Sequence, residues 1–153
     1  MAEVLFYHLT QTPLERTLPE LLEKSLQRGW RVLVKGGDAA RLEFLDTALW
    51  TYRDVSFLPH GTEGDAAAQQ PIYLTAGDEE PNNADILMLV DGAEYPFENM
   101  SNFTRVCILF DGNDQDAVAA ARVGWKSTTI AKLPAKYWAQ DDGRWVQKAE
   151  NTP

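Results

Sequence analysis

Short apolar runs alternate along this chain with stretches in which leucines recur every three or four residues. The apolar runs are continuous, a pattern typical of parallel strands that are covered on both faces. Leucines spaced by three and four residues predict amphipathic helices. We therefore expect an α/β fold with a mostly parallel sheet, whose strands run over residues 4–9, 31–34, 72–75, 86–90 and 106–110.

Three helices are predicted, two of them between these strands and the third after the last strand. Residues 12–15 (Thr-Pro-Leu-Glu) have the composition of a capping box, with Pro13 at the first helical position, and Gly29 is placed to end that helix. Asp38 is the expected cap of the second helix, and the third helix begins at about Asp114. The leucines that define the first two helices are Leu14, Leu18, Leu21, Leu22 and Leu26, then Leu42, Leu45 and Leu49.

The last part of the chain contains a predicted β-hairpin. The turn sequence Asp-Asp-Gly at residues 141–143 separates two aromatic-rich segments, residues 137–140 and 144–147. A chain of 153 residues suits one domain. We therefore expect a single α/β domain over residues 1–150 and a frayed tail over residues 151–153.

Charge is distributed unevenly along the chain. The whole sequence has 14 basic and 23 acidic residues and a net charge of −9, which disfavours general binding of nucleic acids. Residues 122–148, however, contain six basic and two acidic residues, so this segment is +4 and the remainder is −13. Two interpretations remain open: a local surface for an anionic partner on an acidic body, or a solvated basic face without a partner.

The sequence favours a soluble protein of the cytoplasm. The N-terminus has no basic region ahead of a hydrophobic stretch, so no signal peptide is expected. The longest apolar run, residues 86–90, is far too short to span a bilayer. Cys107 is the single cysteine and cannot form an internal disulfide, so an oxidising compartment is not implied.

Candidate catalytic and metal-binding motifs are weak. Gly36-Gly37 precedes a predicted helix but matches no phosphate-loop signature. Asp91 and Asp111 each follow an apolar strand and could bind Mg²⁺ at the carboxyl edge of the sheet, although Asp-Gly is also common turn chemistry. His8 and His60 have no second ligand at zinc-site spacing. We expect no catalytic residue, metal or cofactor, with a Mg²⁺-dependent nucleotide hydrolase that uses the two aspartates as an alternative.

The basic segment contains the best candidate for a binding site. Arg122, Trp125 and Lys126 are spaced by three and four residues, so they fall on one face of the third helix. Aromatic and cationic side chains together suit an acidic peptide that ends in a carboxylate, and they could equally stack single-stranded bases. Trp138 and Trp145 add aromatic surface on the hairpin. In the competing interpretation the tryptophans belong to the core and the cations line its rim.

A second aromatic-rich stretch lies at the end of the second helix, within residues 49–60. Tryptophan and tyrosine are typical anchors of protein interfaces. A partner surface and a small additional core cluster are both compatible with this stretch.

Several short segments of the sequence match a known protein family. Each match alone is weak evidence, but their order along the chain makes the whole set specific. They are Phe6-Tyr7-His8-Leu9, Arg31-Val32-Leu33-Val34, Leu45-Asp46-Thr47-Ala48-Leu49-Trp50, Ser56-Phe57-Leu58-Pro59-His60, Gln70-Pro71-Ile72, Leu109-Phe110-Asp111-Gly112, Ala121-Arg122, Trp125-Lys126, Tyr137-Trp138 and Gly143-Arg144-Trp145. Together, over about residues 4–146, they resemble the chi subunit family of bacterial DNA polymerase III holoenzyme.

The resemblance implies a three-layer α/β/α, Rossmann-like fold, similar to a nucleoside-triphosphatase domain without its phosphate loop. It also implies a non-catalytic adaptor in DNA replication. Such an adaptor joins the clamp-loader complex to single-stranded DNA-binding protein, and it does so by binding the acidic C-terminal tail of that protein, which ends in a phenylalanine.

The resemblance also implies two sets of site residues. Arg122, Trp125 and Lys126 are similar to a tail-binding cluster. The surface for the psi subunit or a helicase-like partner is similar to the region of Trp50, Phe57, Leu58 and Pro59. The protein would contact DNA only indirectly and would associate with the nucleoid through the replisome. A direct binder of single-stranded nucleic acid is the remaining alternative.

Overall fold

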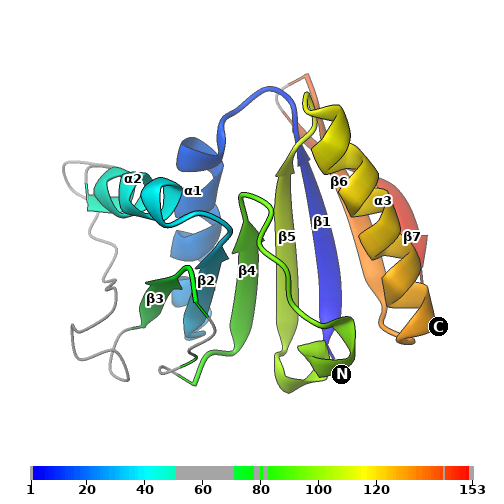
Figure 1. Cartoon of the computed structure of the whole chain (residues 1–153), viewed down its shortest axis with the longest axis horizontal. Coiled ribbons are helices and arrows are strands. Elements are labelled where there is room, and N and C mark those ends of the chain that lie inside the picture. Colours follow the sequence, from blue (N-terminus) through cyan, green and yellow to red (C-terminus); the bar gives the residue numbers. More distant parts are fainter. Residues whose placement is uncertain (1, 51–70, 78–79, 81–82, 143, 152–153) are drawn as a thin grey trace.

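The computed structural model describes residues 2–50, 71–77, 80, 83–142 and 144–151, and in residue 50 it describes the backbone only. Strands and helices alternate along most of this chain (Figure 1). In chain order the elements are β1 (Glu3–Leu9), α1 (Leu14–Gln27), β2 (Val32–Gly36), α2 (Ala39–Trp50), β3 (Ile72–Thr75), β4 (Ile86–Val90), the 3-10 helix η2 (Phe97–Asn102), β5 (Arg105–Asp111), α3 (Gln115–Ile130), β6 (Ala135–Asp141) and β7 (Arg144–Asn151).

In the described part of the chain, seven strands form one sheet in the order β3-β2-β4-β5-β1-β6-β7. Neighbouring strands are parallel, except that β6 and β7 are antiparallel. Every residue of β3 and β4 is buried, as expected for continuous apolar strands. Because the first six strands point the same way, the loops that follow β1, β2, β4 and β5 meet at one edge, the carboxyl edge of the sheet.

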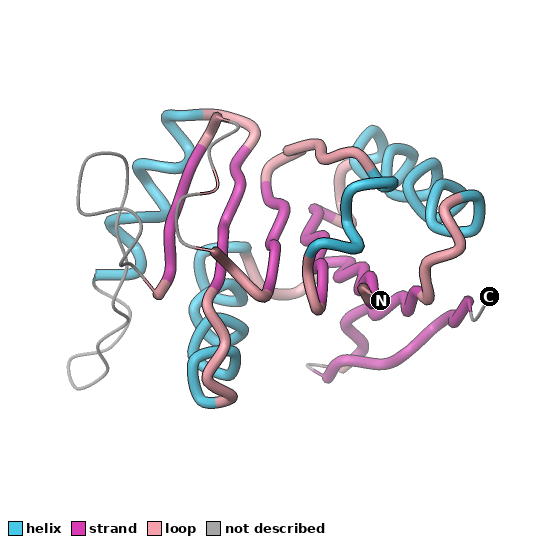
Figure 2. Tube along the Cα trace, turned by 90° about the horizontal axis from the view of Figure 1, so that it is seen from below, coloured by secondary structure: helices cyan, strands magenta, loops and turns pink. Residues whose placement is uncertain are grey.

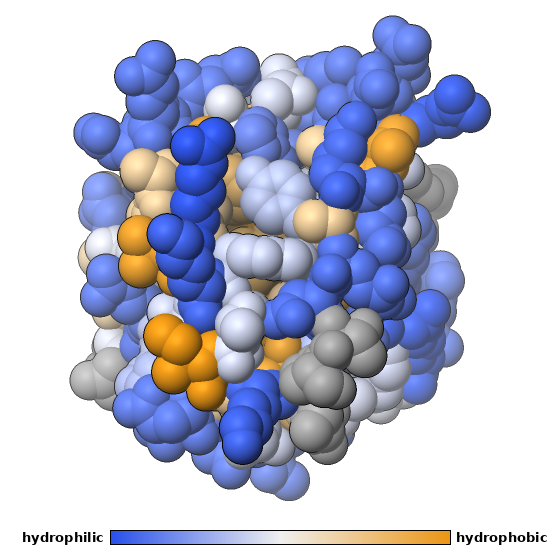
Figure 3. Space-filling model, turned by 90° about the vertical axis from the view of Figure 1, so that its right-hand side faces the viewer, coloured by the Kyte–Doolittle hydropathy of each residue, from blue (hydrophilic) through white to orange (hydrophobic). Residues whose placement is uncertain are grey.

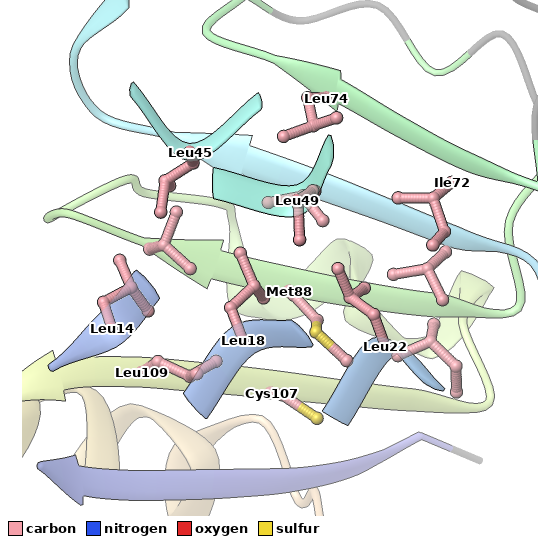
Figure 4. Close-up of a cluster of buried hydrophobic side chains, with 14 of the residues drawn as sticks. Leu14, Leu18, Leu22, Leu45, Leu49, Ile72, Leu74, Met88, Cys107 and Leu109 are labelled. Atoms are coloured by element: carbon pink, nitrogen blue, oxygen red, sulfur yellow. The ribbon is translucent and has the colours of Figure 1, made fainter. Parts of the chain in front are cut away.

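Each face of the sheet has its own hydrophobic core. On one face, leucines of α1 and α2 pack on side chains such as Met88 and Cys107 (Figure 4). On the other face, α3 and η2 cover a second cluster that includes Phe6, Met100 and Ala121. Figure 2 shows α1 and α3 on opposite sides of the strands. The three-layer α/β/α fold is therefore confirmed.

The start of α1 differs from the prediction. The N-cap is Pro13, without a side-chain hydrogen bond, and the helix begins at Leu14. Thr12 does not cap it: its hydroxyl lies 2.8 Å from the Thr17 hydroxyl and accepts a 2.6 Å hydrogen bond from Nε2 of Gln140. The capping-box prediction is wrong because a side chain from β6 holds the residue that would have capped the helix.

Gln140 organises the whole loop between β1 and α1. Its Oε1 accepts hydrogen bonds from the backbone N–H groups of Thr10, Gln11 and Thr12, at 2.9, 2.8 and 3.2 Å. Successive backbone N–H groups that converge on one point form the kind of concavity that binds anions in other proteins. Here the amide oxygen of Gln140 occupies that point.

The other predicted helix ends are confirmed. The Asp38 carboxylate accepts from the N–H of Ala40 at 2.9 Å, and Asp114 caps α3 by accepting from the N–H groups two and three residues on. Gly29 has a φ of 77° after the last turn of α1, the left-handed conformation that glycine adopts readily. Among the described helices, none is both long enough and apolar enough to cross a membrane.

The predicted hairpin is present and longer than expected. β6 and β7 pair from Asp141–Arg144 to Ala135–Asn151, with an irregularity beside Tyr137 and Trp138. Asn151, which we expected to belong to a frayed tail, is the last residue of β7. Residues 152 and 153 lie outside the described residues.

Replacing Gln140 is expected to destabilise the protein. Gln140→Ala leaves three N–H groups to water or to no acceptor, and we expect the free energy of unfolding to fall by about 1 kcal/mol. Urea denaturation measures the change. Gln147→Ala, an exposed glutamine on β7, is the matched control and should change stability by less than about 0.5 kcal/mol. Equal effects of the two substitutions would contradict the structural role of Gln140.

The thiol of Cys107 is expected to be inert in the folded protein. Burial raises the pKa of Cys107 to about 12, above its ordinary value of 9.0, so at pH 8 the reactive thiolate forms mainly in unfolded chains. We expect Ellman's reagent to label the native protein at the rate of unfolding and the urea-unfolded protein at once. Fast labelling of the native protein would contradict this burial.

Candidate peptide-binding site

Two basic side chains project from the exposed part of α3. Arg122 and Lys126 lie one turn apart and are both exposed, whereas Trp125 is partly buried. Figure 3 faces this side of the molecule, where hydrophilic residues are interrupted by pale and orange ones. The helical spacing thus combines two solvent-exposed cations with one aromatic ring that packs inward.

Trp125 belongs to an aromatic cluster between α3 and the sheet, here called the α3 aromatic cluster: Phe6, His8, Phe110, Trp125 and Tyr137. The Trp125 ring lies edge-on, 5.5 Å from Phe6 and 6.1 Å from Tyr137 between centroids. Phe6 and Tyr137 stack 6.2 Å apart. Such ring pairs contribute about 0.5–1.5 kcal/mol each beyond area burial, so these contacts hold the tryptophan in a fixed position on the helix that carries the two cations.

Tyr137 links the cluster to the charged surface. Its hydroxyl lies 2.6 Å from Nδ1 of His8. Partial burial raises the pKa of Tyr137, and the positive charge of Arg122 acts in the opposite direction. An anion bound by Arg122 would therefore lie close to a polar hydroxyl and to aromatic surface, two features that suit a carboxylate next to an apolar group.

Tyr137 was not among the sequence-predicted site residues. It faces α3 because it lies opposite Phe6 in the pairing of β6 with β1, and side chains alternate between the two faces of a strand. This alternation could have indicated that Tyr137 and Trp138 face opposite sides of the sheet. The sequence alone, however, does not show which of the two sides is covered by α3.

The hairpin tryptophans lie apart from this cluster, and the packing of Trp145 fits the interpretation in which it belongs to the core. Trp138 is opposite Tyr7 in the sheet, and the ring of Trp145 lies 5.1 Å from that of Tyr7. Trp145 and Tyr7 pack against the core of α1 and α2, on the face opposite Trp125. A hairpin presents neighbouring residues on opposite faces, so Trp138 and Tyr137 diverge.

The basic segment is not one continuous surface. Lys148 lies 3.8 Å from the carboxylate of Asp141 across the hairpin, with both side chains about half exposed. Lys136 lies opposite Leu5 of β1, on the face away from Arg122. The two cations of α3, Arg122 and Lys126, are both exposed and are spaced three residues and one residue from Trp125.

The second predicted set mostly lies outside the described residues. Phe57, Leu58 and Pro59 fall in the undescribed stretch 51–70, as does His60. Trp50 is the last residue of α2, and its side chain is likewise outside the description.

The two aspartates at the carboxyl edge of the sheet have structural partners: one forms an ion pair and the other a hydrogen bond within a turn. Asp91 lies 3.4 Å from Nε of Arg41, and Asp111 accepts from the N–H of Asn113 at 2.9 Å. A Cβ at Gly37 would collide with the carbonyl oxygen of Asp91. Glycine at this position therefore allows the turn after β2 to pack closely against the backbone after β4. The described residues contain no group of three or more His, Cys, Asp or Glu side chains that could hold a metal ion.

Removing the charge of Arg122 is expected to change the ionisation of Tyr137. In Arg122→Ala the cation that favours the phenolate is gone, so the pKa of Tyr137 should rise further. Titration of the ¹³Cζ resonance of Tyr137 by NMR measures this, with Lys132→Ala, an exposed lysine after α3, as the control. An unchanged or lower pKa in Arg122→Ala would show that the guanidinium does not face the ring.

Comparison with known proteins places the chain in a family. Residues 1–136 match the family model described as DNA polymerase III chi subunit, HolC. The chain is 29% identical over 117 residues to the "Probable DNA polymerase III subunit chi" of Rickettsia prowazekii, which covers 72% of this chain and 71% of that protein. It is 34% identical over 90 residues to the "DNA polymerase III subunit chi" of Pseudomonas aeruginosa, covering 58% and 61%. The chain therefore belongs to the DNA polymerase III chi subunit (HolC) family.

Proposed function

We propose that this chi-family protein is a non-catalytic adaptor that links the clamp-loader complex of DNA polymerase III to single-stranded DNA-binding protein. Its contact with that protein is the acidic C-terminal tail, bound at Arg122, Lys126 and Trp125. The observation that carries the proposal is the pair of exposed cations on α3 directly beside a partly buried aromatic cluster.

The chemistry of this surface fits a peptide that is acidic and ends in an aromatic residue. Within the described part of the chain, neither Arg122 nor Lys126 takes part in an ion pair, so both are available to a carboxylate. A charge-assisted hydrogen bond to a carboxylate contributes about 1.5–3 kcal/mol. The edges of Trp125 and Tyr137 supply aromatic surface on which a terminal phenyl ring can pack.

The acidic remainder of the molecule supports specificity. Residues outside 122–148 carry a net charge of −13 and repel polyanions such as bare DNA, whereas Arg122 and Lys126 form a small exposed pair of cations on α3. A short peptide can reach the basic surface without covering the acidic one. Because exposed charges carry much of the attraction, binding should weaken as salt screens them.

A second contact would be the surface for the psi subunit or a helicase-like partner, formed by Trp50, Phe57, Leu58 and Pro59. This assignment rests on the family resemblance and on the aromatic composition of residues 49–60. It completes the adaptor role, since a link needs one surface for each of the two proteins that it joins.

The alternative of a nucleotide hydrolase is disfavoured by the loop after β1. In doubly wound folds, backbone N–H groups at such a strand-to-helix junction can bind phosphate. Here those of Thr10, Gln11 and Thr12 donate to Gln140 instead. A nucleotide would have to displace that side chain.

Titration with a synthetic acidic peptide that ends in phenylalanine tests the site. We expect calorimetry to show saturable binding, and the double substitution Arg122→Ala, Lys126→Ala to weaken it at least about tenfold, equivalent to 1.4 kcal/mol. The matched control is Arg16→Ala, Lys24→Ala, which removes two exposed cations from α1. A peptide with a C-terminal amide should also bind more weakly. Equal affinity of the Arg122/Lys126 variant and the wild type would refute the site.

A further inference from the structure

A wide groove lies on the other flank of α3. It has a volume of about 1570 Å³ and opens at the carboxyl edge of the sheet, between α3 and the segment that links β4 to η2. In Figure 1 this segment crosses in front of β5. Ala117, Ala120 and Gly124 of α3 line the groove, whereas Arg122, Trp125 and Lys126 are not among its lining residues. The groove and the proposed tail-binding site are therefore separate surfaces.

The floor of the groove is apolar. It includes Ile108 and Phe110 of β5 and Phe97 of η2, and all three are partly exposed. Gly124 allows α3 to pack closely on Phe6 and Phe97, since a Cβ there would lie 3.4 Å from each ring. The helix thus covers β1 but leaves part of β5 accessible, and accessible aromatic and aliphatic side chains favour an apolar group of a ligand.

The rim of the groove is acidic. Seven acidic and two basic side chains occur among the described residues that line it. Both basic side chains have partners: Arg41 pairs with Asp91 at 3.4 Å, and Nζ of Lys35 lies 5.6 Å above the ring of Tyr95. Glu94 and Asp116 are exposed at this rim. The excess of carboxylates favours a ligand that carries positive charge.

We propose that this groove binds a lysine- or arginine-bearing peptide segment of a partner protein, with an aliphatic or aromatic side chain seated on the floor. The charge of the rim selects basic side chains, and the apolar floor selects the anchor. The volume exceeds the 300–1,000 Å³ typical of small-molecule pockets, and the groove is open along its length, so a peptide fits it better than a metabolite. Nucleotides are disfavoured because their phosphates would face carboxylates.

The two flanks of α3 would then bind peptides of opposite charge. This proposal does not depend on the tail-binding site, because Arg122, Trp125 and Lys126 do not line the groove, although Phe6 and Phe110 of the α3 aromatic cluster do. Binding outside the carboxyl ends of the strands is also the usual location for ligands in open α/β sheets.

Fluorescence polarisation of a labelled hexapeptide amide of alternating lysine and leucine tests the proposal with the full chain. We expect saturable binding at micromolar to millimolar concentration. Glu94→Gln combined with Asp116→Asn should weaken it about two- to fivefold for each charge removed. The control pair Glu20→Gln, Glu150→Gln removes two exposed carboxylates elsewhere and should have a smaller effect.

A pair of alanine substitutions on α3 tests the apolar floor. Ala120→Leu places a bulky side chain in the groove and should weaken binding several-fold. Ala119→Leu makes the same change at an exposed position of α3 that does not line the groove and should leave binding unchanged. Thermal melts establish that both variants fold.

Several outcomes would overturn the proposal. One is the absence of saturable binding at peptide concentrations up to millimolar. Another is that a lysine–serine hexapeptide binds as tightly as the lysine–leucine hexapeptide, which would show attraction by charge alone. Equal effects of the groove and control variants, or loss of binding in Arg122→Ala, Lys126→Ala, would place the peptide elsewhere. Loss of acidic-tail binding in the same assay would instead count against the proposed function and leave this groove unaffected.

Discussion

The parallel pairing of β6 with β1 is the constraint on which the rest of this molecule depends. It sets Tyr137 opposite Phe6 beneath α3, and it brings Gln140 to the loop after β1, where its amide holds three backbone N–H groups. One strand therefore builds the aromatic support of the proposed tail-binding site and fills the position at which a related fold would hold a phosphate.

α3 separates two surfaces of different character. On one flank, the exposed cations Arg122 and Lys126 lie on the same helix as Trp125, whose ring packs against Tyr137 of β6. On the flank beside β5, an apolar floor is surrounded by carboxylates. Because a helix displays residues three and four apart on a common side, a single segment of sixteen residues carries both patterns without mixing them. For an adaptor, two oppositely charged peptide surfaces on one rigid helix would allow two partners to bind at once.

The sequence predicts the fold class and most elements correctly, because continuous apolar runs and leucine spacing report burial directly. The caps at Asp38 and Asp114 were also predictable, since capping is local chemistry. The start of α1 was not, because Thr12 is held by Gln140 from the far end of the chain. For the same reason the sequence did not show that Tyr137 packs beside Trp125, or that Trp145 packs against Tyr7 on the opposite face of the sheet. The face of the sheet that a strand residue occupies depends on how its strand pairs with a neighbour. Local sequence patterns do not determine this pairing.

The proposed function requires the Arg122 flank of α3 to hold an acidic tail. The most direct measurement is the change in backbone amide NMR shifts of the ¹⁵N-labelled protein as an acidic peptide ending in phenylalanine is added. We expect saturable shifts centred on residues 122–126 of α3 and on residues 136–138 of β6. Shifts confined to the groove at residues 92–97 and 108–117, or no saturable shifts at all, would contradict it.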